Sequence, residues 1–284
     1  MARPDPVTGL KIIGKLRTIT VGWQPLPWST VVDHYRVYGI QAEGRAAERK
    51  LRGLPDELLL AKSVYPRWEH RGRSAAGETW TYLVVTVDAA GSRSRPSAVA
   101  TGSSTTSISH SGTPLAVVGE FDGRTLELRY APSSYASIPP AYPDAVINVA
   151  HGPDAAERWP YLLPGPGDAW AGRKSYTLHW TVDLAAVPTK PALALWLVDT
   201  TRLAGRLDLK INDQPVEQLE LIIGGTQGSR QGDANLPGSP LIPSYYEFEL
   251  PPTVFRTGSN KITFTLAQGG WVAWDAVGLY QLDA

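Results

Sequence analysis

Residues 258–283, GSNKITFTLAQGGWVAWDAVGLYQLD, contain two runs in which apolar and polar side chains alternate. In the first run Ile262 and Phe264 share one face, and a period of two predicts a half-buried strand. In the second run Val277 and Leu279 share a face, which predicts a second strand. The Gln-Gly-Gly between the two runs predicts a turn. A closing hairpin of this kind is typical of a jelly-roll β-sandwich.

Two residues of this hairpin do not fit a simple strand pattern. Trp271 follows the turn, where a core does not need a large ring. Asp275 falls on the face that should be apolar, where an unpaired carboxylate is costly. We therefore take Trp271 as a candidate ligand contact and Asp275 as a residue that needs a cation or hydrogen-bond donors.

The composition excludes several classes of function. The chain has 284 residues, enough for two domains, and its formal net charge is zero, so no overall field attracts nucleic acid or an anionic membrane. Apolar runs are too short to span a bilayer, and the first residues lack the apolar core of a signal peptide. Cysteine is absent, which excludes disulfides, thiolate nucleophiles and cysteine-bound zinc. Ten Trp and twelve Tyr stand against four Phe, and such amphipathic rings favour binding surfaces or two large cores.

The first hundred residues alternate in short runs with polar turns between them. The clearest are residues 18–23, 34–38 and 77–88, and weaker ones fall at 58–61 and 68–71. About seven short strands without a long helical pattern predict an antiparallel sandwich. Residues 43–60 read as an inserted loop that carries at most one helical turn.

These runs resemble a fibronectin type III domain. The resemblance is carried by Trp23, by the YRVY that begins at Tyr35, and by WTYLVVTVDAAGSRSRPS, in which Trp80 stands where the family usually has its first tyrosine. It implies an Ig-like sandwich over residues 1–102 that serves as a spacer. Residues 103–114 lie in a Ser/Thr/Gly-rich stretch that predicts a linker.

Residues 115–284 form the second predicted domain. Two alternating runs surround Asp122-Gly123, and further runs lie at 176–182, 192–198, 206–211, 219–223 and 246–250. Between them, residues 131–174 are rich in Pro, Gly and aromatic rings. A structureless loop of that length is unusual in a compact domain unless the loop has a function.

The second domain resembles a carbohydrate-binding module. The pieces GEFDGRTLEL, SYTLHWTVDL, GRLDLKINDQPV and WDAVGLYQL are similar in order and spacing to the C-terminal jelly roll of polysaccharide lyase family 4, the rhamnogalacturonan lyases. The ending also occurs in galactose-binding-like modules. The resemblance covers the two non-catalytic domains of that family, so it implies an extracellular module pair whose chain-linked catalytic domain acts on an acidic polysaccharide.

Motifs of known catalytic chemistry are missing from the sequence, including G-x-S-x-G, H-E-x-x-H and the P-loop. One alternative is a lyase or glycoside hydrolase site in the 131–174 loop, where His151 lies near Asp154 and Glu157. Another alternative is a purely structural spacer.

A sugar-binding surface accounts better for the loop aromatics. Covering about 60 Å² of a sugar face at about 25 cal/mol/Å² yields on the order of 1.5 kcal/mol, whereas micromolar binding needs about 8 kcal/mol. Several rings and polar partners are therefore required. The candidates are loop residues of the second domain: Trp159, Tyr161, Trp170, Arg230, Asp233, Asn235 and Trp271. The alternative for Trp159 and Tyr161 is that they pack the loop onto the sandwich.

The resemblance also implies a structural calcium ion at Asp275. Glu120, Asp122 or Glu127 would supply the partner oxygens, since calcium takes six to eight hard ligands. The alternative is a carboxylate that is satisfied by backbone N–H groups or by an arginine.

Overall fold

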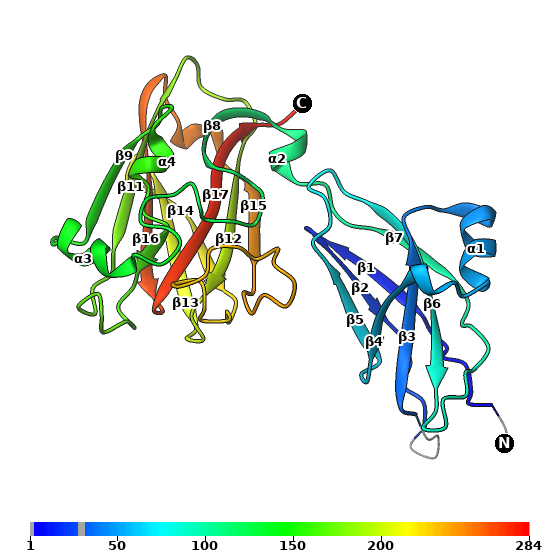
Figure 1. Ribbon diagram of the computed structural model, residues 1–284. Helices are drawn as coiled ribbons and strands as arrows, with labels where there is room; N and C mark the ends of the chain where they lie inside the picture. The colour runs from blue at the N-terminus through cyan, green and yellow to red at the C-terminus, as the bar shows by residue number, and fades with distance from the viewer. Residues whose placement is uncertain (1–2, 28–31, 284) are drawn as a thin grey trace. The chain divides into compact units, whose positions relative to one another are not determined.

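The structure is a computed structural model that describes residues 3–27 and 32–283. The chain divides into two compact units, Met1–His110 and Ser111–Ala284, which are described separately (Figure 1). The division falls inside the stretch predicted as a linker. That stretch is not without structure, because it holds the end of β7 (Ala100–Ser103), the short helix α2 (Ile108–Ser111) and the start of β8 (Thr113–Gly119).

Unit 1 is a sandwich of two antiparallel sheets, which confirms the fibronectin type III arrangement. A three-stranded sheet has the order β1-β2-β5, and a four-stranded sheet has the order β4-β3-β6-β7. Their strands are β1 (Lys11–Lys15), β2 (Thr18–Gly22), β3 (His34–Ile40), β4 (Leu59–Ser63), β5 (Arg67–Arg71) and β6 (Thr79–Val87), with β7 as given above. Alternate residues of β2, β3 and β6 meet between the sheets, among them Ile19, Val37 and Val84, which are fully buried.

The segment predicted as an inserted loop contains a nine-residue helix, α1 (Gly44–Arg52). Ala47 and Leu51, one helical turn apart, are buried. Leu51 packs with Tyr38, Leu83 and Val85 on the outer side of the four-stranded sheet. The helix therefore covers that side, which explains why β6 is buried on both faces along most of its length. A short 3₁₀ turn, η1 (Asp56–Leu58), follows it.

Unit 2 is a sandwich of two five-stranded sheets, the predicted jelly roll. One sheet has the order β10-β17-β12-β15 with β8 also paired to β17, and the other has the order β14-β13-β16-β11-β9. Their bounds are β9 (Val146–Ala150), β10 (Leu162–Pro164), β11 (Thr177–Leu184), β12 (Pro191–Thr200), β13 (Gly205–Ile211), β14 (Gln214–Leu221), β15 (Ser244–Glu249), β16 (Gly258–Gln268) and β17 (Trp271–Gln281). The inward side chains of both sheets form one core.

The two strands predicted at the C-terminus form, and Gly269 lies in the turn between β16 and β17 at φ 96°. They are not the hairpin that was predicted, because β16 and β17 enter different sheets and do not pair with each other (Figure 1). β17 pairs with β12 along one edge and with β10 and β8 along the other. A strand that is central to its sheet and covered on both sides is buried throughout, and residues 271–280 are all buried.

The long segment 131–174 is not the structureless loop that the sequence indicated. It contains β9 and β10 together with η2 (Tyr135–Ser137), α3 (Ile138–Ala141) and α4 (Ala155–Arg158). β9 extends one sheet by pairing in parallel with β11, and β10 extends the other by pairing with β17. In contrast, the run after Asp122 was predicted as a strand, but it forms turns. The strand before it, β8, ends at Gly119. The remaining short turn is η3 (Pro252–Val254).

Over the described ranges 3–27 and 32–283, no helix has both the length and the apolar character needed to cross a membrane.

Candidate functional site

Three of the four predicted sugar-binding rings lie in the core of unit 2. Trp159, Tyr161 and Trp271 expose 1%, 0% and 4% of their surface, so their interpretation as stacking platforms is wrong. Trp159 makes edge contacts with Trp180 and Trp274, at centroid distances of 5.9 and 5.6 Å. The physical reason is that β10 joins the sheet directly after Tyr161, which draws the preceding residues inside the sandwich.

Trp170 is the predicted ring that keeps an accessible surface. It is half-buried, and it packs edge-on against the half-buried Tyr135 with the ring centroids 5.1 Å apart. Tyr135 lies in η2, within the same aromatic-rich segment, and no feature of its sequence surroundings distinguishes it from the neighbouring aromatic residues. The two rings support each other, because edge-to-face pairs are favourable beyond the area that they bury.

The loop of residues 224–243 is joined to this ring pair through Tyr161. The Tyr161 hydroxyl donates to the Ser229 carbonyl at 2.7 Å, directly before Arg230. Burial raises the pKa of Tyr161 well above its usual range, and the neighbouring Tyr135 contributes to that shift. Contacts therefore run from Trp170 through Tyr135 and Tyr161 to the start of the arginine-bearing loop.

A buried carboxylate fixes the same loop at its base. Asp199, at the end of β12, is fully buried and accepts the N–H groups of Gly225, Gln227 and Gly228 at 2.6, 2.8 and 2.8 Å. Three donors satisfy a carboxylate without a counter-cation. Sequence reasoning missed Asp199, which followed an apolar strand as an ordinary turn residue would.

The three polar candidates of the loop have different surroundings. Arg230 is exposed, and within the described part of the chain its side chain makes no hydrogen bond or ion pair. Asp233 pairs with Arg124 at 3.1 Å, and the Asn235 amide donates to the Asp122 carbonyl at 2.8 Å. Asp233 and Asn235 therefore bind the loop to the turn after β8. Of the three polar candidates, Arg230 is the one whose side chain remains available to a ligand.

Asp275 is 1% exposed, and its Oδ1 accepts the backbone N–H groups of Gly123 and Arg124 at 2.9 and 3.0 Å. Among the residues that the structure describes, no group of three or more acidic or histidine side chains is placed to hold a metal. The predicted partners Glu120, Asp122 and Glu127 are thus not assembled around Asp275, and Glu127 instead accepts the N–H of Glu120 at 2.9 Å. The calcium ion stays a prediction.

The catalytic alternative placed His151 beside Asp154 and Glu157. The structure pairs Asp154 with Arg158 at 2.8 Å, and His151 is exposed at the rim of a separate hollow of about 490 Å³ that Glu120 and Glu127 also line. Burial raises the pKa of Glu127 above its ordinary value. Among the described residues, no hydrogen bond or ion pair links the His151 side chain to Asp154 or Glu157.

The chain matches no protein-family model. It likewise matches no curated protein. Among solved structures, a human fibronectin type III domain (fibronectin type III domain containing protein 3) is 11% identical with a TM-score of 0.29, over 39% of this chain and 94% of that one. A family 35 carbohydrate-binding module from Clostridium thermocellum is 12% identical with a TM-score of 0.27, over 38% of this chain and 71% of that one.

An α-L-rhamnosidase from Dictyoglumus thermophilum is 12% identical with a TM-score of 0.31, and the likeness covers 94% of this chain but 26% of the rhamnosidase. At these scores the likenesses identify neither a family nor a ligand for this chain.

Proposed function

We propose that this chain is a non-catalytic module pair that binds carbohydrate and directs a polysaccharide-degrading enzyme to its substrate. The binding surface of unit 2 consists of Tyr135, Trp170 and Arg230. The enzyme is a chain-linked polysaccharide lyase, the target is an acidic plant or microbial polysaccharide such as rhamnogalacturonan, and the site of action is extracellular.

The observation that carries this proposal is the half-exposed Tyr135–Trp170 pair beside a fixed arginine loop. Sugars present C–H faces that lie against aromatic rings, and two adjoining rings offer more such surface than one. The edge-to-face packing at 5.1 Å holds both rings in place, so little conformational entropy is lost when a sugar binds.

Arg230 supplies the polar contact that an acidic sugar requires. Its guanidinium is exposed, and a guanidinium binds a carboxylate through two parallel hydrogen bonds. Asp199 holds the backbone around Gly228, two residues before Arg230. A fixed backbone next to a free charged side chain suits recognition of a uronate on a polymer that passes the ring pair.

The proposal is tested by calorimetry on the full chain against a panel of neutral and acidic polysaccharides. Trp170→Ala should weaken binding by about tenfold, since the lost stacking is on the order of 1.5 kcal/mol. Val187→Ala is the matched control, because Val187 is an exposed apolar residue in the turn between β11 and β12. Unchanged affinity in Trp170→Ala would remove this surface from the proposal.

A structural spacer is the second candidate function. The burial of Trp159, Tyr161 and Trp271 favours it, because a module without accessible rings has little to stack on a sugar. The same calorimetric panel separates the two functions. A spacer binds none of the polysaccharides, whereas a binding module binds at least one of them.

A further inference from the structure

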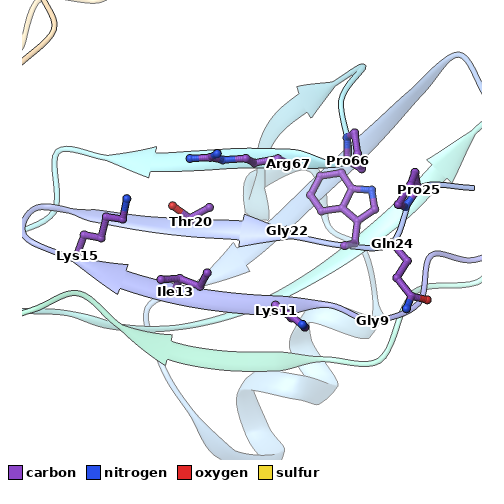
Figure 2. A pocket seen from close by; sticks show the side chains of 11 residues that line it. Gly9, Lys11, Ile13, Lys15, Thr20, Gly22, Gln24, Pro25, Pro66 and Arg67 are labelled. Carbon is purple, nitrogen blue, oxygen red and sulfur yellow. The ribbon is translucent and has the colours of Figure 1, made fainter. Parts of the chain in front are cut away.

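The outer face of the β1-β2-β5 sheet in unit 1 carries a groove of about 520 Å³. Figure 2 shows Lys15, Ile13 and Thr20 on neighbouring strands of this face, with Arg67 on the third strand. Alternation along β1 turns Lys11, Ile13 and Lys15 outward together, and all three line the groove. The residues of β1 were not singled out in the sequence, because a short polar strand looks like an ordinary solvated edge.

Gly22 forms the bottom of the groove between two cations. The strand pairing sets Lys11 opposite Gly22 and Gly22 opposite Arg67, so one row across the sheet reads cation, glycine, cation. A side chain on Gly22 would meet no atom within 4 Å. Since neighbouring strands lie about 4.8 Å apart, the row leaves an open trough roughly 10 Å wide between the backbones that bear the two charges.

The face is basic, although the whole chain is neutral. Glu69 is its one carboxylate, and it pairs with both Arg67 and Arg71. The hydrogen bond from Arg71, followed by that from Arg67, lowers the pKa of Glu69 against the opposing effect of burial. Lys11 and Lys15 are exposed and have no acidic partner within the described residues. Four cations therefore stand against one anion.

Two buried polar groups line the groove without a hydrogen-bond partner among the described residues. Thr20 is 8% exposed and its hydroxyl is unpaired, and Trp23 is 6% exposed and its indole N–H is unpaired. Buried polar atoms are normally satisfied, so each of them needs a water or a ligand.

An exposed ring adjoins the groove. Tyr65 is 72% exposed, and it is the one aromatic side chain among the described residues that belongs to the large exposed hydrophobics. Together with Arg67, Glu69 and Arg71 it lines a shallow hollow of about 420 Å³, so Arg67 borders both the hollow and the groove. Tyr65 is thus a more exposed ring than the half-buried Trp170 and Tyr135 of unit 2.

We propose that this face of unit 1 binds a linear polysaccharide that carries uronate carboxylates. The carboxylates lie on Lys11, Lys15 and Arg67, and a sugar face lies on Tyr65. The inference rests on the proposed function in taking the ligand to be a polysaccharide, and it makes unit 1 a second binding unit instead of a spacer.

The charge distribution favours a sparsely charged polymer over nucleic acid. Lys11 and Lys15 are four residues apart, which is about 13 Å along a strand. Duplex DNA carries one charge per about 1.7 Å of its axis, and proteins that bind it usually present a dense basic patch. A face that places a carboxylate, Glu69, between two arginines does not match such a ligand.

The test uses the full chain and calorimetric titration with polygalacturonate, which has one carboxylate on every sugar, and with its methyl ester, which has none. Lys11→Ala/Lys15→Ala/Arg67→Ala should weaken polygalacturonate binding by at least about tenfold and reduce its dependence on salt. The ester should bind the unaltered chain at least about tenfold more weakly than polygalacturonate does. Tyr65→Ala should weaken both polymers by a similar factor.

The matched control is Arg45→Ala/Arg49→Ala/Lys50→Ala, which removes the same charge from exposed positions of α1. An equal loss of affinity in this control, or no loss in the groove variant, would overturn the inference. Tighter binding of single-stranded DNA than of polygalacturonate would overturn it in favour of nucleic acid. Trp170→Ala in the same titrations reports on unit 2 alone, so each proposal can fail without the other.

Discussion

The Asp199 carboxylate accepts the backbone N–H of Gly228 at 2.8 Å, and the two residues lie so close that a Cβ atom on Gly228 would be 2.7 Å from the Cβ atom of Asp199. One residue thus explains both why the loop turns back onto β12 and why a glycine stands at this point. The contact is local, but it determines the position of the segment that bears Arg230.

Asp199→Asn should destabilise unit 2 and weaken carbohydrate binding together. An amide has one acceptor oxygen where the carboxylate serves three N–H donors, so at least one buried donor is left unpaired. Such a loss costs about 2 kcal/mol, which corresponds to a fall in Tm of about 4–8 °C. Differential scanning calorimetry measures it, with the exposed Asp183→Asn as control. A stable variant with normal affinity would contradict this role of Asp199.

The two tryptophans Trp159 and Trp170 should differ sharply in their contribution to stability. Trp159→Ala leaves a cavity among Trp180, Phe264 and Trp274 and should cost about 3–5 kcal/mol. Trp170→Ala removes a ring that is already half in solvent, so the loss should stay near 1 kcal/mol. Urea unfolding of both variants gives the comparison. Equal losses would mean that Trp170 is a core residue and not a ligand contact.

Unit 1 should lose stability as the solution is acidified through the range of His70. This histidine is 8% exposed, stacks on Trp68 and lies with Nδ1 2.9 Å from the Tyr82 hydroxyl. Burial, followed by the charge of Arg73, lowers the pKa of His70 to about 4. In the unfolded chain His70 takes up its proton at about pH 6.5, whereas in the folded chain it stays neutral until about pH 4. The free energy of unfolding should therefore fall by at most about 3 kcal/mol as the pH decreases between these two values.

The measurement is the free energy of unfolding of the wild type and of His70→Gln from about pH 7.5, which is above the ordinary histidine pKa, down to about pH 4. The variant should be less stable at neutral pH and should lack this part of the acid dependence. Parallel curves for the two proteins would show that another group governs the transition.

Calcium should leave the Tm of the chain unchanged. Oδ1 of Asp275 already accepts two backbone N–H groups, and the described residues provide no cluster of three acidic or histidine ligands for a hard cation. Thermal scans in EDTA and in excess calcium make the comparison, with magnesium as the control for ionic strength. A higher Tm in calcium alone would instead establish the ion that the resemblance implied.

Local patterns allowed much of the fold to be predicted from the sequence. The strands β16 and β17 and the turn between them are an example, because the alternation of Ile262 and Phe264 and the conformation of Gly269 depend on neighbouring residues alone. The exposure of Trp159 and Trp271 could not be predicted in the same way. It depends on the pairing of β10 with β17, whose residues are more than a hundred positions apart.

The groove on unit 1 shows the same limit for a candidate site. The alternation of Lys11, Ile13 and Lys15 is present in the sequence, but it supported no prediction, because a short run of this kind does not by itself indicate a binding site. Its meaning depends on Gly22 and Arg67, which the register of two further strands brings into one row. Nothing in the sequence around Tyr65 distinguishes it from the other tyrosines, because its exposure depends on the fold.

The central place of β17 has a consequence for synthesis on the ribosome. β8 and β12 both pair with it, so neither can complete its sheet before residues 271–281 have emerged. β8 is translated about 160 residues earlier, and at roughly 5–20 residues per second its apolar side waits on the order of ten to thirty seconds for its partner. Unit 1 has all its strands by then, so the nascent chain would carry a complete sandwich followed by strands of unit 2 whose edges stay unpaired, and therefore prone to aggregation, until residues 271–281 emerge.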